Sequence, residues 1–206
     1  MLVLGIDTSS SVAAVALLLD DKVIGEIAIN HTKTHSQKLM PIIDQLLKNV
    51  EVQVQDLDLI AVTVGPGSFT GVRIGLSAAK GFAHPYKIPV VEVSSIKGLA
   101  YNTHLSTSIV CPLIDARRNQ VYSGAYVWHG DVLETVLSED QYMIDQLLEQ
   151  LLKLMEGTEH NKVVFVGDGV LVHRELIMEK LGLQAEFANP ANIMQRGTSI
   201  ALLGKA

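Results

Sequence analysis

Residues 2–29, LVLGIDTSSSVAAVALLLDDKVIGEIAI, contain three consecutive strand signals. Apolar and β-branched residues fill positions 2–6, 12–19 and 23–29, and Asp20-Asp21 separates the last two runs by the length of a tight hairpin turn. The stretch therefore predicts a three-stranded antiparallel meander, which the rest of the chain must cover.

Alternating helix and strand patterns follow the meander. An apolar stripe predicts a helix that begins at Ser36 and extends to about residue 50. The chain continues with a strand at residues 57–64, a helix at 70–83, a strand at 90–93 and a short helix that ends near residue 102.

The second half repeats this order with residues that hardly match. It predicts strands at residues 109–115, 120–128 and 132–137, and a helix that begins at Ser138 with Gln141 in a capping box. The last four elements are expected at residues 163–166, 170–181, 185–187 and 192–203. Each half reads β-β-β-α-β-α-β-α. We therefore predict an α/β fold of two like domains, residues 1–106 and 107–206, with mixed sheets and a cleft between them.

Composition excludes several classes of protein. The 206 residues are 48% hydrophobic, which argues against disorder, and their net charge of −6 argues against a protein that binds nucleic acid alone. The single cysteine, Cys111, cannot form an internal disulfide and is expected to be buried. No apolar run approaches the roughly 20 residues that cross a bilayer, so we expect a cytoplasmic protein.

Asp7-Thr8-Ser9 follows the first strand directly. A carboxylate with hydroxyl residues in a turn suits a phosphate group or hydrated Mg²⁺, because the turn supplies backbone N–H groups and Asp supplies an oxygen ligand. An ordinary Asx turn is the alternative. Asp115, at the end of the equivalent strand in the second half, favours the functional interpretation, because the repeat would direct both carboxylates into the cleft.

The segment from residue 65 to 73, GPGSFTGVR, joins a buried strand to a helix. Gly65 and Gly67 allow a sharp turn, Thr70 can cap the helix, and Arg73 with the free N–H groups would form an anion site. The segment is not a P-loop, because the Gly-Lys-Ser/Thr ending is absent. Glycines that serve close packing in a strand-to-helix turn are the alternative.

The helix after this loop is apolar around most of its circumference and carries small residues three or four apart. Such a helix must be covered on more than one side. Together with the helix at Ser36 it could offer a face to another protein, and the alternative is burial within its own domain.

Neither metal-ligand spacing nor a nucleophile elbow occurs in the sequence. Arg117-Arg118 faces the cleft or a charged partner, or forms a solvated hairpin, and Gly167-Asp168-Gly169 is a further turn that could face a phosphate.

Four segments resemble one known family. GIDTSS, HSQKLMPIIDQLL, GPGSFTGVRIGLSAAKGFA and IDARRNQVY are similar to the TsaB (YeaZ) family of tRNA threonylcarbamoyladenosine biosynthesis proteins. The resemblance is strong over residues 1–126 and only positional beyond them. It implies a duplicated actin-like, ribonuclease H-like fold of the ASKHA superfamily, with the dimerisation helices in the N-terminal domain.

The resemblance also implies a function. The catalytic paralogue of the family, TsaD, carries an H-x-x-x-H metal pair just after the fifth strand, and here Ser95 and Leu99 stand in those places. The family would act as a non-catalytic scaffold that pairs with TsaD and TsaE, and so supports threonylcarbamoyl transfer to adenosine 37 of ANN-decoding tRNAs. It would form a homodimer when isolated and reach tRNA only through the complex, with no membrane contact.

The site residues that we expect fall into two sets. We expect no tightly bound cofactor, and ATP or ADP would bind weakly or at the partner interface, near Asp7, Thr8, Ser9, Gly65, Gly67 and Arg73. The partner interface would include Leu39, Ile42, Ile43, Leu46, Gly71, Gly75, Ala78, Ala79 and Phe82. An autonomous ATP-dependent small-molecule kinase of the actin-like superfamily is the alternative function, motivated by Asp7, Asp115 and the glycine loops.

Overall fold

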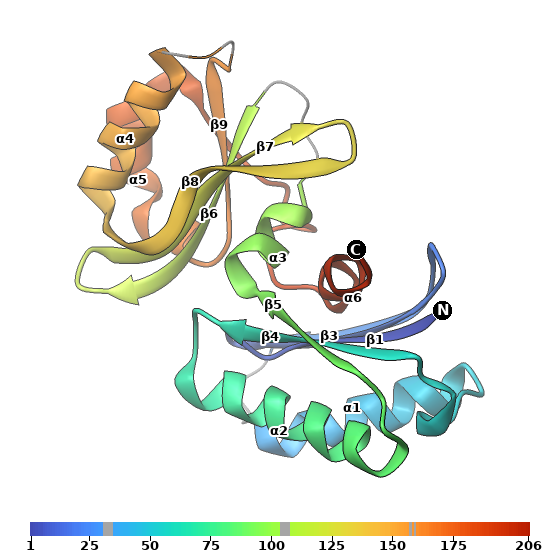
Figure 1. The fold of residues 1–206 in the computed structure, drawn as a ribbon. Helices are drawn as coiled ribbons and strands as arrows, with labels where there is room; N and C mark the ends of the chain where they lie inside the picture. The colour runs from blue at the N-terminus through green and yellow to red at the C-terminus, as the bar shows by residue number, and fades with distance from the viewer. Residues whose placement is uncertain (31–34, 104–107, 157, 159) are drawn as a thin grey trace. The chain divides into compact units, whose positions relative to one another are not determined.

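The computed structural model describes residues 1–30, 35–103, 108–156, 158 and 160–206 (Figure 1). Its element order confirms the predicted repeat. The first half contains β1 (Leu2–Asp7), β2 (Val12–Leu19), β3 (Lys22–Asn30), α1 (His35–Asn49), the 3₁₀ turn η1 (Val54–Asp56), β4 (Leu59–Gly65), α2 (Phe69–Tyr86), β5 (Val90–Ser94) and α3 (Ser95–Tyr101). The second half contains β6 (Ser108–Arg117), β7 (Gln120–His129), β8 (Val132–Met143), α4 (Ile144–Glu156), β9 (Lys162–Val166), α5 (Gly169–Leu181), η2 (Gly182–Gln184), β10 (Ala185–Phe187) and α6 (Gly197–Lys205).

Two five-stranded mixed sheets with the same topology follow from this repeat. The strand orders are β3-β2-β1-β4-β5 and β10-β9-β6-β7-β8. In the first sheet β1 pairs antiparallel with β2 and parallel with β4, so the meander and the α/β units share one sheet. In the second sheet β6 pairs in the same way with β7 and β9. The predicted α/β fold class is confirmed.

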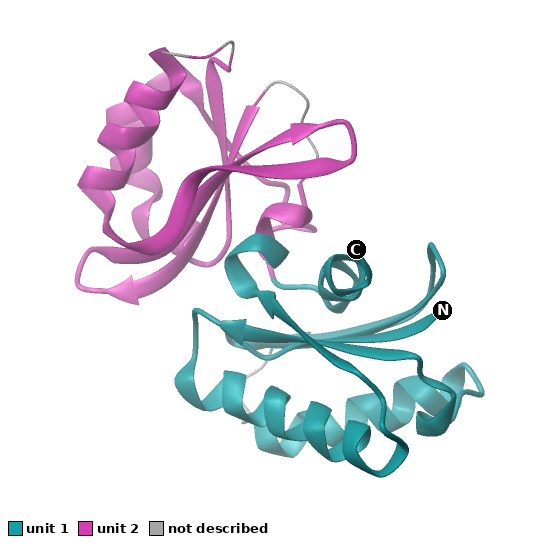
Figure 2. Ribbon diagram, viewed as in Figure 1, with its two compact units in different colours: residues 1–98, 195–206 teal, residues 99–194 magenta. Residues whose placement is uncertain are grey.

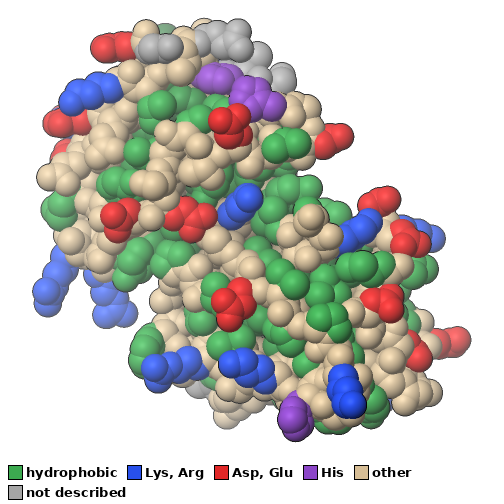
Figure 3. Space-filling model, in the orientation of Figure 1, with side chains coloured by type: hydrophobic (Ala, Val, Ile, Leu, Met, Phe, Trp, Pro, Cys, Tyr) green, Lys and Arg blue, Asp and Glu red, His purple; other side chains and the backbone are tan. Residues whose placement is uncertain are grey.

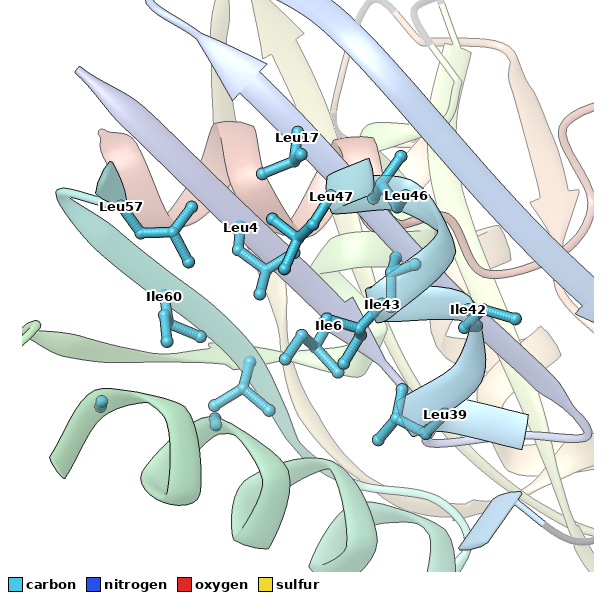
Figure 4. Packing of buried hydrophobic residues seen from close by; sticks show 14 of the residues in the cluster. Leu4, Ile6, Leu17, Leu39, Ile42, Ile43, Leu46, Leu47, Leu57 and Ile60 are labelled. Carbon is cyan, nitrogen blue, oxygen red and sulfur yellow. The ribbon is translucent and has the colours of Figure 1, made fainter. Parts of the chain in front are cut away.

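Helices cover both faces of the first sheet. On one face, α1 and α2 pack on side chains of β1, β2 and β4, among them Leu4, Ile6 and Leu17 (Figure 4). On the other face, Ile200 and Ala201 of α6 pack on a second set of buried residues from the same strands. Strands buried on both faces read as continuous apolar runs, which explains why β2 is VAAVALLL without alternation.

The chain does not divide at residue 106. Residues 1–98 and 195–206 form one compact unit, and residues 99–194 form the other (Figure 2). The last helix returns to the first sheet, where glycines allow a close approach: a Cβ atom at Gly5 would lie 2.2 Å from Gly197 O. Arg196 Nη2 also lies 2.6 Å from Glu26 Oε2 of β3. Periodicity identifies a helix but does not tell which sheet it covers.

The boundary between β8 and α4 also differs from the prediction. Residues 138–143 extend β8, where Gln120 pairs with Met143, and α4 begins only at Ile144. A capping-box pattern is a local signal, and the strand ladder overrides it here. The apolar residues of α4 are nevertheless buried, namely Ile144, Leu147, Leu148, Leu151 and Met155. Cys111 is buried, as expected. Among the helices of the described ranges, none has the length and apolar character needed to cross a membrane.

Candidate functional site

The carboxylate of Asp7 lies buried at the end of β1, within its own turn. Its Oδ1 accepts hydrogen bonds from Ser9 N at 2.8 Å, Ser9 Oγ at 2.6 Å and Thr63 Oγ1 at 3.3 Å. Burial raises the pKa of Asp7 to about 6, although the three hydrogen bonds lower it. Asp7 therefore forms an Asx-type turn, and a phosphate site at this turn stays a prediction.

The glycine loop packs directly on this turn. Ser68 N donates a hydrogen bond to Ser9 O at 2.6 Å, and Thr8 Oγ1 donates one to Gly71 O at 2.8 Å. A Cβ atom at Gly67 would lie 2.2 Å from Ser9 O, and one at Gly71 would lie 2.1 Å from Thr8 O. These glycines therefore allow the glycine loop and the start of α2 to pack directly on the backbone of Thr8 and Ser9.

The loop also differs from the predicted anion site in two respects. Ser68, not Thr70, caps α2, since its Oγ accepts a hydrogen bond from Gly71 N at 3.1 Å. Arg73 is exposed, and its guanidinium carbon lies 3.6 Å from the centroid of the Phe69 ring. The structure thus brings Asp7, Thr8, Ser9, Gly65 and Gly67 together at one corner of the sheet and leaves Arg73 on the exposed surface.

A second polar cluster occupies the corresponding corner of residues 99–194. Asp168 Oδ1 accepts a hydrogen bond from Asp115 N at 3.2 Å, and burial raises the pKa of the Asp168 carboxyl above its ordinary value. His173, which sequence reasoning missed, is buried with Nε2 3.9 Å from Asp115 Oδ1. Arg117 and Arg118 are exposed in the hairpin turn, as the solvated alternative predicted. That Asp7 and Asp115 face one cleft stays a prediction.

The predicted interface residues need correction, because most of them belong to the core. The apolar side chains of α1 lie against the first sheet (Figure 4), and the buried residues Ala79 and Ala83 of α2 belong to the same cluster. A Cβ atom at Gly75 would lie 2.4 Å from Thr8 Oγ1, so this small residue lets α2 approach β1. Only Ala78 and Phe82 are half-buried, and the other predicted residues are buried, namely Leu39, Ile42, Ile43, Leu46, Gly71, Gly75 and Ala79.

A groove between α1 and α2 offers the exposed apolar surface instead. Its volume is about 540 Å³, and its lining includes Met40, Phe69, Ile74, Ser77 and Ala78. The side chain of Phe69 is 69% exposed and that of Met40 is 49% exposed. Sequence reasoning missed both because they lie outside the apolar stripes. Both are apolar residues at positions that the helical period assigns to the exposed face, and this pattern could have indicated the groove.

Within the described residues, no group of three or more His, Cys, Asp or Glu side chains could hold a metal ion. Ser95 and Leu99, the residues compared above with a histidine pair, are fully buried in α3. An imidazole at either position would therefore meet packed side chains.

Sequence comparisons match this chain to proteins of tRNA threonylcarbamoyladenosine biosynthesis. A family model described as "TsaD: tRNA N6-adenosine threonylcarbamoyltransferase" matches residues 22–205. The tRNA threonylcarbamoyladenosine biosynthesis protein TsaB of Bacillus subtilis (strain 168) is 37% identical over 205 residues, which cover 100% of this chain and 87% of that protein. TsaB of Escherichia coli (strain K12) is 31% identical over 159 residues, covering 73% of this chain and 68% of that protein.

Solved structures share the fold. YeaZ from Pseudomonas aeruginosa superposes with a TM-score of 0.81 at 24% identity, covering 99% of this chain and 90% of that one. The ROK hexokinase from Thermus thermophilus superposes with a TM-score of 0.57 at 12% identity, covering 100% of this chain and 99% of that one. The duplicated actin-like fold is thereby confirmed.

Proposed function

The chain belongs to the TsaB (YeaZ) family of tRNA threonylcarbamoyladenosine biosynthesis proteins, and we propose that it is a non-catalytic scaffold subunit that pairs with a TsaD-family enzyme. With TsaE, the pair would support threonylcarbamoyl transfer to adenosine 37 of ANN-decoding tRNAs in the cytoplasm. This chain would meet tRNA only through the complex, and any ATP or ADP would bind weakly or at the partner interface.

The observation that carries this proposal is the exposed groove between α1 and α2. A protein leaves an aromatic side chain such as Phe69 exposed at a cost, and clustered apolar exposure marks an interaction surface. Burying the exposed part of one Phe side chain contributes roughly 1–2 kcal/mol. Met40, Ile74 and Ala78 extend the same surface across both helices. A second copy of this chain would occupy the groove when the partner is absent.

Two features support a non-catalytic role. Ser95 offers one hydroxyl and Leu99 offers no ligand atom, so neither replaces an imidazole at a metal centre. Of the residues expected to bind a nucleotide, Asp7 already accepts hydrogen bonds at Oδ1 from Ser9 N, Ser9 Oγ and Thr63 Oγ1. Both features support a role in which this chain binds and positions another subunit.

Reconstitution of tRNA modification tests the proposal. The chain would be combined with purified TsaD, TsaE, threonylcarbamoyl adenylate, ATP and an ANN-decoding tRNA, and the modified nucleoside would be measured by mass spectrometry. We expect the product to require both this chain and TsaD, and this chain alone to form none. Full activity without this chain, or turnover by it alone, would contradict the proposal.

Phe69→Asp is the variant that connects this activity to the groove. It should weaken TsaD binding at least tenfold in calorimetry, since it removes the apolar contact and buries a charge. The matched control is Leu171→Asp on α5, because Leu171 is 70% exposed and Phe69 is 69% exposed. The control should bind as the wild type does. Equal binding by both variants would remove the groove from the proposal.

A further inference from the structure

The exposed face of α2 carries basic charge only. Arg73, Lys80 and His84 are exposed on the helix, and Lys87 follows as its C-cap. The spacing of seven and four residues keeps Arg73, Lys80 and His84 on one face of the helix. Lys87 lies beyond the helix and lines the same hollow as Lys80 and His84. The helix sequence, FTGVRIGLSAAKGFAHPY, contains neither Asp nor Glu. In Figure 3, blue and purple side chains gather along the visible face of α2 with no red side chain among them. We name Arg73, Lys80, His84 and Lys87 the basic stripe.

The charges of the basic stripe are not neutralised within the described chain. Among the residues that the structure describes, none of the four forms a salt bridge, and Arg73 contacts the Phe69 ring instead. The neighbouring helix α1 holds one acidic residue, Asp44, and its Oδ2 is already 2.8 Å from Lys48 Nζ. The exposed charged residues of α2 are therefore all basic, although the net charge of the chain is −6.

The basic stripe runs beside the apolar groove. Arg73 lines the groove between α1 and α2, while Lys80, His84 and Lys87 line a second hollow of about 890 Å³ at the far end of α2. The stripe extends about 20 Å at the helical rise of ~1.5 Å per residue. Its length matches a partner helix of three to four turns lying along α2.

We propose that the segment that docks on α2 is a partner helix whose apolar face is flanked by Asp and Glu side chains, and that this charge selects it over a second copy of this chain. The inference rests on the proposed function and specifies the chemistry of the partner. A two-fold homodimer uses one patch twice, so it would bring two basic stripes together, and α1 of each copy would contribute one acidic residue, Asp44. Like charges placed together across an interface suppress the wrong partner.

A nucleic-acid backbone is the other anionic occupant that a basic stripe can bind. The structure favours a protein helix, because the stripe borders the apolar side chains of Met40, Phe69 and Ile74, which phosphates do not cover. The net charge of −6 further opposes unaided binding of tRNA by the free chain. The experiment must therefore distinguish binding of tRNA to α2 from binding of a partner helix.

The test measures binding of TsaD to three forms of this chain by calorimetry at 50 mM and 500 mM NaCl. Wild type should lose about tenfold in affinity at the higher salt, because attraction between exposed charges is screened. Lys80→Glu/Lys87→Glu should bind at least tenfold more weakly than wild type at low salt and lose most of its salt dependence. Lys22→Glu/Lys153→Glu changes the net charge equally at exposed lysines elsewhere and should match the wild type.

Two further measurements complete the test. Self-association of the isolated wild type, followed by sedimentation equilibrium, should strengthen from 50 mM to 500 mM NaCl, opposite in sign to TsaD binding. TsaD binding that is independent of salt and unchanged by charge reversal would overturn the inference and leave the proposed function standing. Absence of TsaD binding at either salt would overturn both. Salt-dependent tRNA binding to the free chain that Lys80→Glu/Lys87→Glu abolishes would overturn the inference in favour of nucleic acid.

Discussion

At the residue scale, Asp7 shows how one carboxylate can suggest a ligand site and yet hold a turn together. Its Oδ1 accepts hydrogen bonds from Ser9 N, Ser9 Oγ and Thr63 Oγ1. Burial raises the pKa of the Asp7 carboxyl from 3.8 to about 6. The folded chain thus binds this proton more tightly than the unfolded chain does. The corresponding stability is present below pH 4 and is lost as the pH rises through about 6.

Replacement of Asp7 should remove this pH dependence. A shift from 3.8 to about 6 corresponds to about 3 kcal/mol at 1.36 kcal/mol per pKa unit. Part of this free energy is already lost at pH 4, because the unfolded group is then mostly ionised. The free energy of unfolding of wild type, relative to that of Asp7→Asn, should therefore fall by about 2 kcal/mol between pH 4 and pH 7. Urea denaturation at each pH measures it, with exposed Asp44→Asn as the control. Parallel profiles for wild type and Asp7→Asn would show that Asp7 keeps its ordinary pKa.

Two small residues of α2, Gly75 and Ala78, lie on different sides of the helix, so their replacement distinguishes a core position from an interface position. Gly75 faces β1, where an added Cβ atom would lie 2.4 Å from Thr8 Oγ1, whereas Ala78 is half-buried and lines the groove. We expect Gly75→Trp to unfold the chain or lower its melting temperature by more than 10 °C, because overpacking cannot be relieved there. Ala78→Trp should remain folded and lose TsaD binding. Circular dichroism and calorimetry would distinguish them, and a stable Gly75→Trp variant would show that this side of α2 is not core.

At the element scale, the closing helix α6 shows what local patterns cannot predict. The element order could be predicted because each helix and strand leaves its own period in the sequence. The sheet that α6 covers could not, since that choice depends on contacts across nearly the whole chain, such as Arg196 with Glu26. The predicted start of α4 at Ser138 was also wrong, because the pairing of β8 with β7 outweighs the local capping signal.

The candidate site was predictable to a different extent. The sequence placed Asp7, Thr8, Ser9 and the glycine loop at strand ends, and the structure brings them together. The partner surface was harder, because an apolar stripe indicates that a helix has a buried face but not which surface buries it. The stripes of α1 and α2 face their own sheet, and Phe69 lies outside them.

Removal of the Ile200 side chain tests the position of α6. Ile200 is fully buried against the first sheet, and a Cβ atom at Gly98 would lie 2.5 Å from its Cδ1. Ile200→Ala should lower the free energy of unfolding of the unit formed by residues 1–98 and 195–206 by about 2–5 kcal/mol. Hydrogen exchange of β1, β2 and β4 measures the loss. Unchanged exchange in these strands would mean that α6 does not cover them.

At the scale of the whole molecule, the repeated fold and the uneven charge fit the proposal that this protein acts through a partner. Two units share one topology, but only the first carries the groove with Phe69 and the basic stripe beside it. The net charge of −6 limits direct contact with tRNA. The basic stripe places three of the 16 Lys and Arg residues on α2 and its C-cap, where we propose that a subunit docks. Pairing of a partner with α1 and α2 would connect these features.

Hydrogen–deuterium exchange of this chain with and without TsaD tests that claim most directly. We expect added protection in α1 and α2, concentrated at peptides that contain Met40, Phe69 and Ala78, because burial at the interface slows exchange there. The surface of α5 around Leu171 should exchange equally in both samples. Protection centred on α5, or no protection of α1 and α2 when TsaD is bound, would contradict the claim.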